Sequence, residues 1–229
     1  MLTFSRHRPA FDRLKGVDEL FRLAQSIRFK PRTGGGVLLP GFLCRSHSAY
    51  LAAVRLALSG QVVEAYMVLR GCLENALYAF YVHADPEDSG TESGDPRHES
   101  RALIWVKRGT SNEATKRCRN VFTAGKTKEA LEARDERLAQ WAGRLYDTSI
   151  DQGAHPNVDG HLVTSSTTDN GVSVRYLMPD TIPWKVCVQQ AAEAGLCSLR
   201  VFELIYPAEF ESICVSTKLS SLDWRQADQ

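Results

Sequence analysis

The stretch QVVEAYMVLRGCLENALYAFYVHAD (residues 61–85) is apolar around almost its whole circumference when it is drawn as a helix, which is typical of a central helix in a bundle. It follows LPGFLCRSHSAYLAAVRLALSG (residues 39–60), an alanine-rich segment that ends in Ser59-Gly60. A short break at a glycine favours two antiparallel helices. We therefore predict helices over 41–58 and 61–83, with the second at the centre of the fold.

Further helices are indicated on both sides of this pair. Apolar residues recur at steps of three and four in several other segments, as they do in amphipathic helices. The segments predicted as helices in this way are 10–29, 127–152 and 182–206, with shorter helices in 97–109 and 110–122. The chain is expected to fold as an all-α bundle of about six or seven helices.

One segment departs from the helical pattern. HLVTSSTTDNGVSVRYLMP (residues 161–179) places two runs rich in Val, Thr and Ser around Asp169-Asn170-Gly171, a turn signal of β-hairpins. We predict a hairpin here, inserted before the last long helix. No shift of composition divides residues 1–229, so we expect a single domain. Residues 84–96 are expected to form a mobile acidic loop, and residues 216–229 a loose tail.

The composition excludes some functions and leaves others open. The net charge of +1 gives no global reason to expect a nucleic-acid or membrane partner. Charge is unevenly spread, however, because residues 97–144 hold twelve basic and six acidic side chains, whereas residues 145–229 hold five and eleven. Such segments complement each other within one fold or across a homodimer, and the alternative is a basic face for RNA or phosphate.

The chain shows the features of a soluble cytoplasmic protein. Its start, MLTFSRHRPAF, lacks the apolar core of a secretory signal, and no run approaches the roughly 18 apolar residues of a membrane span. The six cysteines form no C-x-x-C pair, and neither they nor the six histidines have zinc-binding spacing. We expect free cysteines, no metal, no cofactor and no membrane partner.

Arg70 and Glu74 are the first candidate site. They lie one turn apart on a stripe of the central helix whose other members are Val63, Met67, Leu77 and Tyr81. A charge pair on a face that should be buried costs free energy unless it is paired and hydrogen-bonded. It is therefore either a structural ion pair, with Tyr78 or His47 as a further partner, or part of a polar site in the bundle or at a dimer seam.

The second candidate is RLYDTSIDQGAHPNVDGH (residues 144–161), where a helix is expected to end. Gly153 suits the position after a helix C-terminus, and Pro156 holds His155 extended. His155 is the candidate catalytic base or ligand, Asp151 is placed to orient it, and Asn157 favours a turn. The alternative is a capped helix end whose His and Asn bond only backbone groups.

Both candidate segments resemble a known pattern. Residues 41–83, with Glu64, Leu69-Arg70 and Glu74, and residues 144–157, with Tyr146, Ser149 and HPN, resemble uncharacterised bacterial all-helical proteins similar to the HEPN-like superfamily. The resemblance implies a helical bundle, a homodimer and, in some members, RNase activity in toxin or phage-defence systems. Active HEPN RNases carry an Arg and, after it, a His with four to six residues between them, and no Arg in this chain is followed by a His at that spacing.

These observations favour an oligomeric binding module for a small ligand or protein partner, with Arg70, Glu74, Asp151, His155 and Asn157 as its ligand-binding residues. One alternative is a metal-independent RNase or toxin, in which His155 is the acid–base and Arg70 or Arg144 holds phosphate. The other is a structural or antitoxin-like interaction protein, in which Arg70 and Glu74 form only a core pair.

Overall fold

Helix α4 (Val62–His83) is the centre of the molecule, as its apolar circumference predicts. Twelve of its residues are buried, whereas Met67 is exposed and Arg70 and Glu74 are only partly covered. The computed structural model describes residues 6–27, 37–85, 99–154, 162, 164–169 and 171–222. Within these, α4 packs against α3 (Leu39–Leu58) on one side and α10 (Ile182–Ile205) on another. The all-α bundle predicted from the sequence is confirmed.

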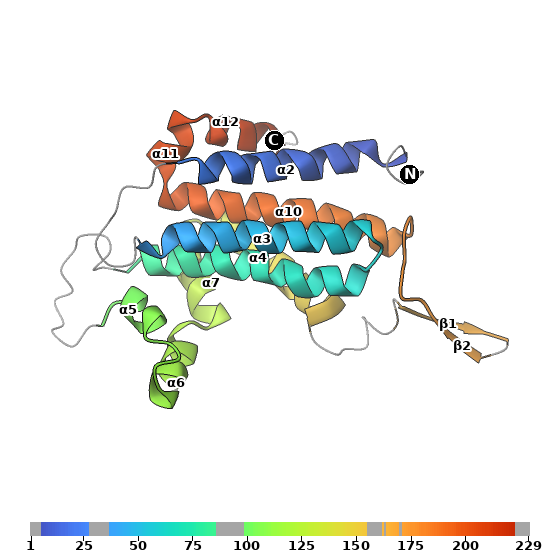
Figure 1. Cartoon of the computed structure of the whole chain (residues 1–229), viewed down its shortest axis with the longest axis horizontal. Helices are drawn as coiled ribbons and strands as arrows, with labels where there is room; N and C mark the ends of the chain where they lie inside the picture. Colours follow the sequence, from blue (N-terminus) through green and yellow to red (C-terminus); the bar gives the residue numbers. More distant parts are fainter. Residues whose placement is uncertain are drawn as a thin grey trace.

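The long helices run along one another (Figure 1). Helix α2 (Arg8–Gln25) lies against α10 and α3, and α8 (Glu136–Ser149) lies against α10 and α4. Gly195 of α10 allows this close approach, because a Cβ atom there would lie 2.5 Å from Val17 Cγ1 and 2.8 Å from the Tyr50 ring. Burial of the apolar faces between these helices is the main stabilising term.

The α3–α4 pair is antiparallel and turns at Gly60, as predicted. Gly60 has φ +83°, a conformation that favours glycine. Its carbonyl oxygen accepts a hydrogen bond from Met178 N at 2.9 Å, and a Cβ atom there would lie 3.0 Å from the Pro179 ring. This turn therefore also holds the segment that leads from the hairpin into α10.

The predicted helix over 127–152 is three elements instead of one. They are α7 (Ala124–Glu132), α8 and a π-helical turn, η2 (Ile150–Ala154). Asp135 separates the first two, because its side chain accepts a hydrogen bond from Leu138 N at 2.9 Å and starts a new helix. The predicted apolar residues Leu131 and Leu138 are buried as expected, so the interruption does not change the buried face.

The remaining elements are short. Helices α5 (Arg101–Val106) and α6 (Asn112–Val121) lie below the bundle in Figure 1, and strands β1 (Ser165–Thr168) and β2 (Gly171–Val174) form the predicted hairpin, which projects from one end. The other two are α11 (Pro207–Ser212) and α12 (Val215–Leu222).

Two expectations about irregular segments have different outcomes. The tail was expected to be loose over 216–229, but residues 216–222 belong to α12, because Val215 and Leu219 are fully buried against neighbouring elements. Residues 223–229 lie outside the described part of the chain. The acidic segment 84–96 also lies outside the described part of the chain, except for Ala84 and Asp85. In the part of the chain that the structure describes, no helix is long and apolar enough to cross a membrane.

Candidate functional site

Arg70 and Glu74 form the predicted ion pair, but the face that carries it is only half-buried. Arg70 Nε donates to Glu74 Oε1 at 2.8 Å, and the two side chains are 27% and 29% exposed. The expectation of a buried face is wrong at this end of the stripe, because Met67 is 49% exposed; only Leu77 and Tyr81 are buried. Neighbouring helices cover the second half of the stripe and leave the first half open.

Tyr146 of α8 completes the pair. Its hydroxyl donates to Glu74 Oε1 at 3.1 Å, and the Arg70 guanidinium lies 5.1 Å from the centre of its ring. Burial, with the Glu74 charge beside it, raises the pKa of Tyr146 to about 12, so its phenol stays protonated and acts as a donor near neutral pH. Burial acts against the charged form of Arg70, but the hydrogen bond and charge of Glu74 outweigh it and raise the Arg70 pKa.

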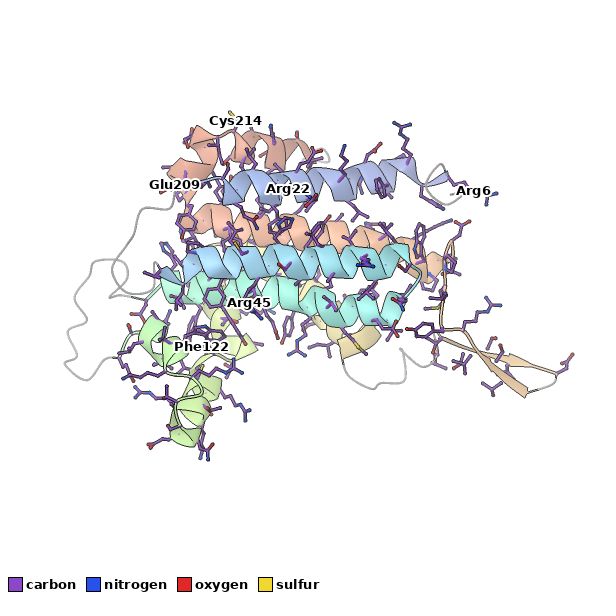
Figure 2. All side chains as sticks on the ribbon, in the orientation of Figure 1. Arg6, Arg22, Arg45, Phe122, Glu209 and Cys214 are labelled. Carbon is purple, nitrogen blue, oxygen red and sulfur yellow. The ribbon has the colours of Figure 1, made fainter. Side chains whose placement is uncertain are left out.

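Arg70 and Glu74 line a groove of about 610 Å³ between α3, α4 and α5. Three arginines from different segments line it: Arg45 on α3, Arg70 on α4 and Arg108 just after α5. Figure 2 shows Arg45 on the side of α3 nearest α4 and the α5–α6 segment. The other lining residues are Leu38, Gly41, Phe42, Glu74, Asn75, Tyr78 and Trp105.

The described residues give the groove a positive charge. Glu74 is the single carboxylate among those that line it, and it is bound to Arg70. Neither Arg45 nor Arg108 forms an ion pair with any residue in the described ranges. The Arg108 guanidinium lies 5.4 Å from the centre of the Trp105 ring, within the range of a cation–π contact. Two guanidinium groups are thus available to an anion.

An aromatic cluster fixes the wall that carries Arg108. The Trp105 ring lies 5.3 Å from Phe42, 5.3 Å from Tyr78 and 4.9 Å from Phe122, measured between ring centres. Edge and tilted contacts of this kind stabilise aromatic pairs beyond the area they bury. They attach the short helix α5 to α3 and α4, so Trp105 and Arg108 are held beside Arg45 and Arg70.

The described part of the second predicted segment, residues 144–154, lies beside the same helix. Asp151 lies in η2 and is exposed, whereas His155 and Asn157 fall outside the residues that the structure describes. Gly153 is required for a different reason than predicted. The chain continues in a π-helical turn with no left-handed glycine, and a Cβ atom at Gly153 would overlap the carbonyl oxygen of Val63 on α4.

The structure thus joins the two candidate segments at one point. Tyr146 from the start of the second segment contacts both members of the charge pair in the first. Tyr78, considered as a partner of the charge pair, lines the groove beside it, whereas the sequence did not indicate the contribution of Arg45, Asn75, Trp105 and Arg108. Each belongs to an ordinary helical or helix-end pattern, and only the packing of α5 against α3 and α4 brings them together.

His47, considered as a partner of the charge pair, belongs to another cluster. Its Nε2 atom lies 2.7 Å from Asp18 Oδ1, and its Nδ1 atom lies 3.0 Å from Gln25 Nε2. Its ring stacks on Phe21 with centres 4.9 Å apart. This cluster joins α2 to α3 and does not line the groove.

Metal ligation and comparison with known proteins add no further assignment. The described residues contain no group of three or more His, Cys, Asp or Glu side chains that could hold a metal ion. No protein-family model, no curated protein and no solved structure matches the chain. The chemistry of the groove therefore rests on its own residues.

Proposed function

We propose that the protein is a binding module for a small phosphorylated ligand, which occupies the groove between α3, α4 and α5. The observation that carries this proposal is the convergence of Arg45, Arg70 and Arg108 on one groove, with Glu74 as the single carboxylate among the described lining residues. Side chains of like charge repel one another, so their gathering calls for a compensating anion.

Arginine suits phosphate better than other anions of the same charge. Its planar guanidinium donates two parallel hydrogen bonds to phosphate oxygens, which adds geometric specificity to the attraction. In the groove, Arg45 and Arg108 would hold the phosphate, while Arg70 is oriented by Glu74 and Tyr146. The Asn75 amide, which donates to the Gly71 carbonyl through Nδ2, leaves its oxygen as an acceptor for a ligand hydroxyl or amine.

The rest of the ligand would be of modest size and partly apolar. A volume of about 610 Å³ lies within the range of small-molecule sites. Phe42 and Trp105 supply apolar surface next to the arginines, a combination that suits a phosphate joined to a planar ring, as in a nucleotide.

Isothermal titration calorimetry with adenosine 5′-monophosphate, ribose 5-phosphate and inorganic phosphate tests the proposal. We expect binding of the first two, and a loss of about tenfold or more in affinity on Arg45→Ala, the effect of one charge-assisted hydrogen bond. Arg55→Ala is the matched control, because Arg55 is exposed on the same helix and does not line the groove. Equal binding by both variants, or none by the wild type, overturns the proposal.

Cleavage of RNA is a second proposal. It is favoured by the contact of Tyr146 with Arg70 and Glu74, because Tyr146 belongs to the segment that leads to His155 and Arg70 could bind phosphate. In this case His155 would act as acid–base and Arg70 would hold the scissile phosphate. Degradation of labelled RNA by the wild type, but not by His155→Ala, supports it. Equal activity of the two proteins contradicts it.

The oligomeric state and compartment belong to the same proposal. We infer a homodimer in the cytoplasm, related to the HEPN-like superfamily. All six cysteines are free, as is usual in a reducing compartment, and the helical bundle is the fold that the resemblance implies.

A further inference from the structure

The β1–β2 hairpin projects from the bundle and has an apolar face that the described part of its own chain leaves uncovered (Figure 1). Val172 and Val174 are 72% and 70% exposed. Alternate residues of a strand share a face, so the two valines lie on one side and Ser173 on the other. Amphipathic strands of this kind normally turn their apolar side toward a core.

The outer edge of β2 is open to a further strand. Arg175 N donates to Thr164 O at 2.7 Å, and hydrogen-bonded pairs alternate along an antiparallel ladder, so the backbone groups of Val172 and Val174 point away from β1. Natural edge strands are usually protected by charged residues or proline, and the strands Ser165–Thr168 and Gly171–Val174 contain neither. A two-stranded hairpin alone is only marginally stable in water.

Two charges beside the strand complement each other but cannot meet within one hairpin. Asp169 lies at its tip and Arg175 at its base, and neither forms an ion pair within the described residues. Gly171, close to Asp169 at the tip, is four residue steps from Arg175, a distance of about 13 Å along the strand. An antiparallel second strand would reverse this order and bring the two charges to the same end.

We propose that the hairpin is a dimerisation arm, in which β2 pairs antiparallel with β2 of a second copy of this chain. A two-fold axis at Ser173 places Val172 opposite Val174 of the other copy, and Arg175 opposite Gly171. Asp169 of the other copy is then the diagonal neighbour of Arg175, within reach of a long side chain. One strand thus supplies both halves of a contact that is complementary in shape and in charge.

The apolar area for such a dimer lies in the same segment. Seven of the thirteen large apolar side chains exposed in the described residues fall between residues 162 and 186. They are Leu162, Val172, Val174, Tyr176, Leu177, Ile182 and Val186. Stable interfaces bury roughly 800 Å² per partner, more than strand pairing alone supplies. The residues that flank the hairpin provide this additional surface.

Sedimentation equilibrium of the full chain tests the arm. Over a concentration range that extends to about 100 μM, we expect the wild type to form a dimer. We expect Val172→Lys to stay monomeric and the matched control Ser166→Lys to dimerise. Ser166 lies on β1 and pairs with Ser173, so it is on the face opposite the two valines and away from the proposed contact. A monomeric wild type, or a dimeric Val172→Lys, overturns the proposal.

Charge reversal tests the register. We expect Asp169→Arg and Arg175→Asp each to weaken the dimer by about fivefold or more, and the double variant to recover most of the loss, because its two charges are exchanged. A double variant that dimerises no better than the single variants contradicts this pairing. Since the arm specifies the interface of the proposed homodimer but not the groove, Val172→Lys is expected to keep its affinity for adenosine 5′-monophosphate, which separates failure of one proposal from failure of the other.

Discussion

At the scale of single residues, a buried imidazole is held at both of its ring nitrogens. His47 lies between Asp18 and Gln25, and Arg22 Nε donates to the other carboxylate oxygen of Asp18 at 3.0 Å. Burial acts to raise the pKa of Asp18, but the hydrogen bonds and charges of His47 and Arg22 outweigh it and lower that pKa. The cluster therefore joins α2 to α3 through a carboxylate that is kept ionised.

This carboxylate makes a prediction about acid stability. Because the pKa of Asp18 is lower in the folded than in the unfolded chain, its ionised carboxylate stabilises the fold above the unfolded-state pKa, near 4. This stabilisation is lost as the pH falls through the folded-state pKa. Asp18→Asn is expected to lower the free energy of unfolding by about 1 kcal/mol at pH 7, and to flatten its decline below pH 4. Urea unfolding from pH 7 to pH 2.5 measures both effects.

Asp12→Asn is the control for this series, because Asp12 lies on the same helix with its side chain 59% exposed. It is expected to leave the acid limb of the stability curve unchanged. If the two variants have superimposable pH profiles, the Asp18–His47 contact does not contribute to acid stability.

At the scale of elements, the π-helical turn η2 depends on a glycine for close packing. Gly153 lies against α4, where any Cβ atom would overlap Val63 O and approach Tyr66 Cβ to 3.0 Å. Such turns interrupt regular helices and occur frequently at functional sites. Here the turn directs the chain after α8 along the helix that carries Arg70 and Glu74.

Gly153→Ala is accordingly expected to lower the free energy of unfolding by about 1–3 kcal/mol, the usual cost of overpacking. Gly125→Ala is the matched control, because Gly125 lies in α7 with nothing within 4 Å of an added Cβ atom. Alanine is the better helix former, so this variant is expected to be more stable by up to about 1 kcal/mol. Urea unfolding compares the two. Equal effects would contradict the packing role of Gly153.

Local patterns predicted most of these elements and missed the interruptions between them. The apolar pattern of residues 61–85, the break at Gly60 and the hairpin signal at 169–171 are properties of neighbouring residues, and the central helix, the turn at Gly60 and the pairing of β1 with β2 are confirmed. The break before Asp135 was missed because the preceding Ala133 and Arg134 favour helix continuation. The groove was only half predicted, because Arg45 and Arg108 become neighbours of Arg70 only through tertiary packing.

At the scale of the whole molecule, the Arg70–Glu74 pair is expected to contribute to ligand binding but little to stability. Replacing a paired, half-buried Arg and Glu together with apolar residues removes both charges and leaves no lone ion. The double variant Arg70→Met, Glu74→Leu is therefore expected to unfold within about 1 kcal/mol of the wild type. It is also expected to lose most of its affinity for adenosine 5′-monophosphate, because one of three arginines is gone.

Urea unfolding and calorimetry on the same preparation provide the two measurements. The single variant Arg70→Met is a useful companion, because it leaves Tyr146 as the one described residue that hydrogen-bonds Glu74, and it is expected to be the less stable of the two. A double variant that binds as tightly as the wild type would assign the pair a purely structural role, as expected for an antitoxin-like interaction protein.

The close approach of Gly195 to Val17 has a consequence for how the chain is synthesised. At about 5–20 residues per second, the segment between them takes on the order of 10–35 s to leave the ribosome. During that time the apolar side of α2, with Leu14, Val17 and Phe21, has not yet met α10, against which it packs in the finished molecule. Helix α2 thus acquires its full set of neighbours only after α10 has been translated, so nascent chains that stall before α10 would present an exposed apolar surface to chaperones.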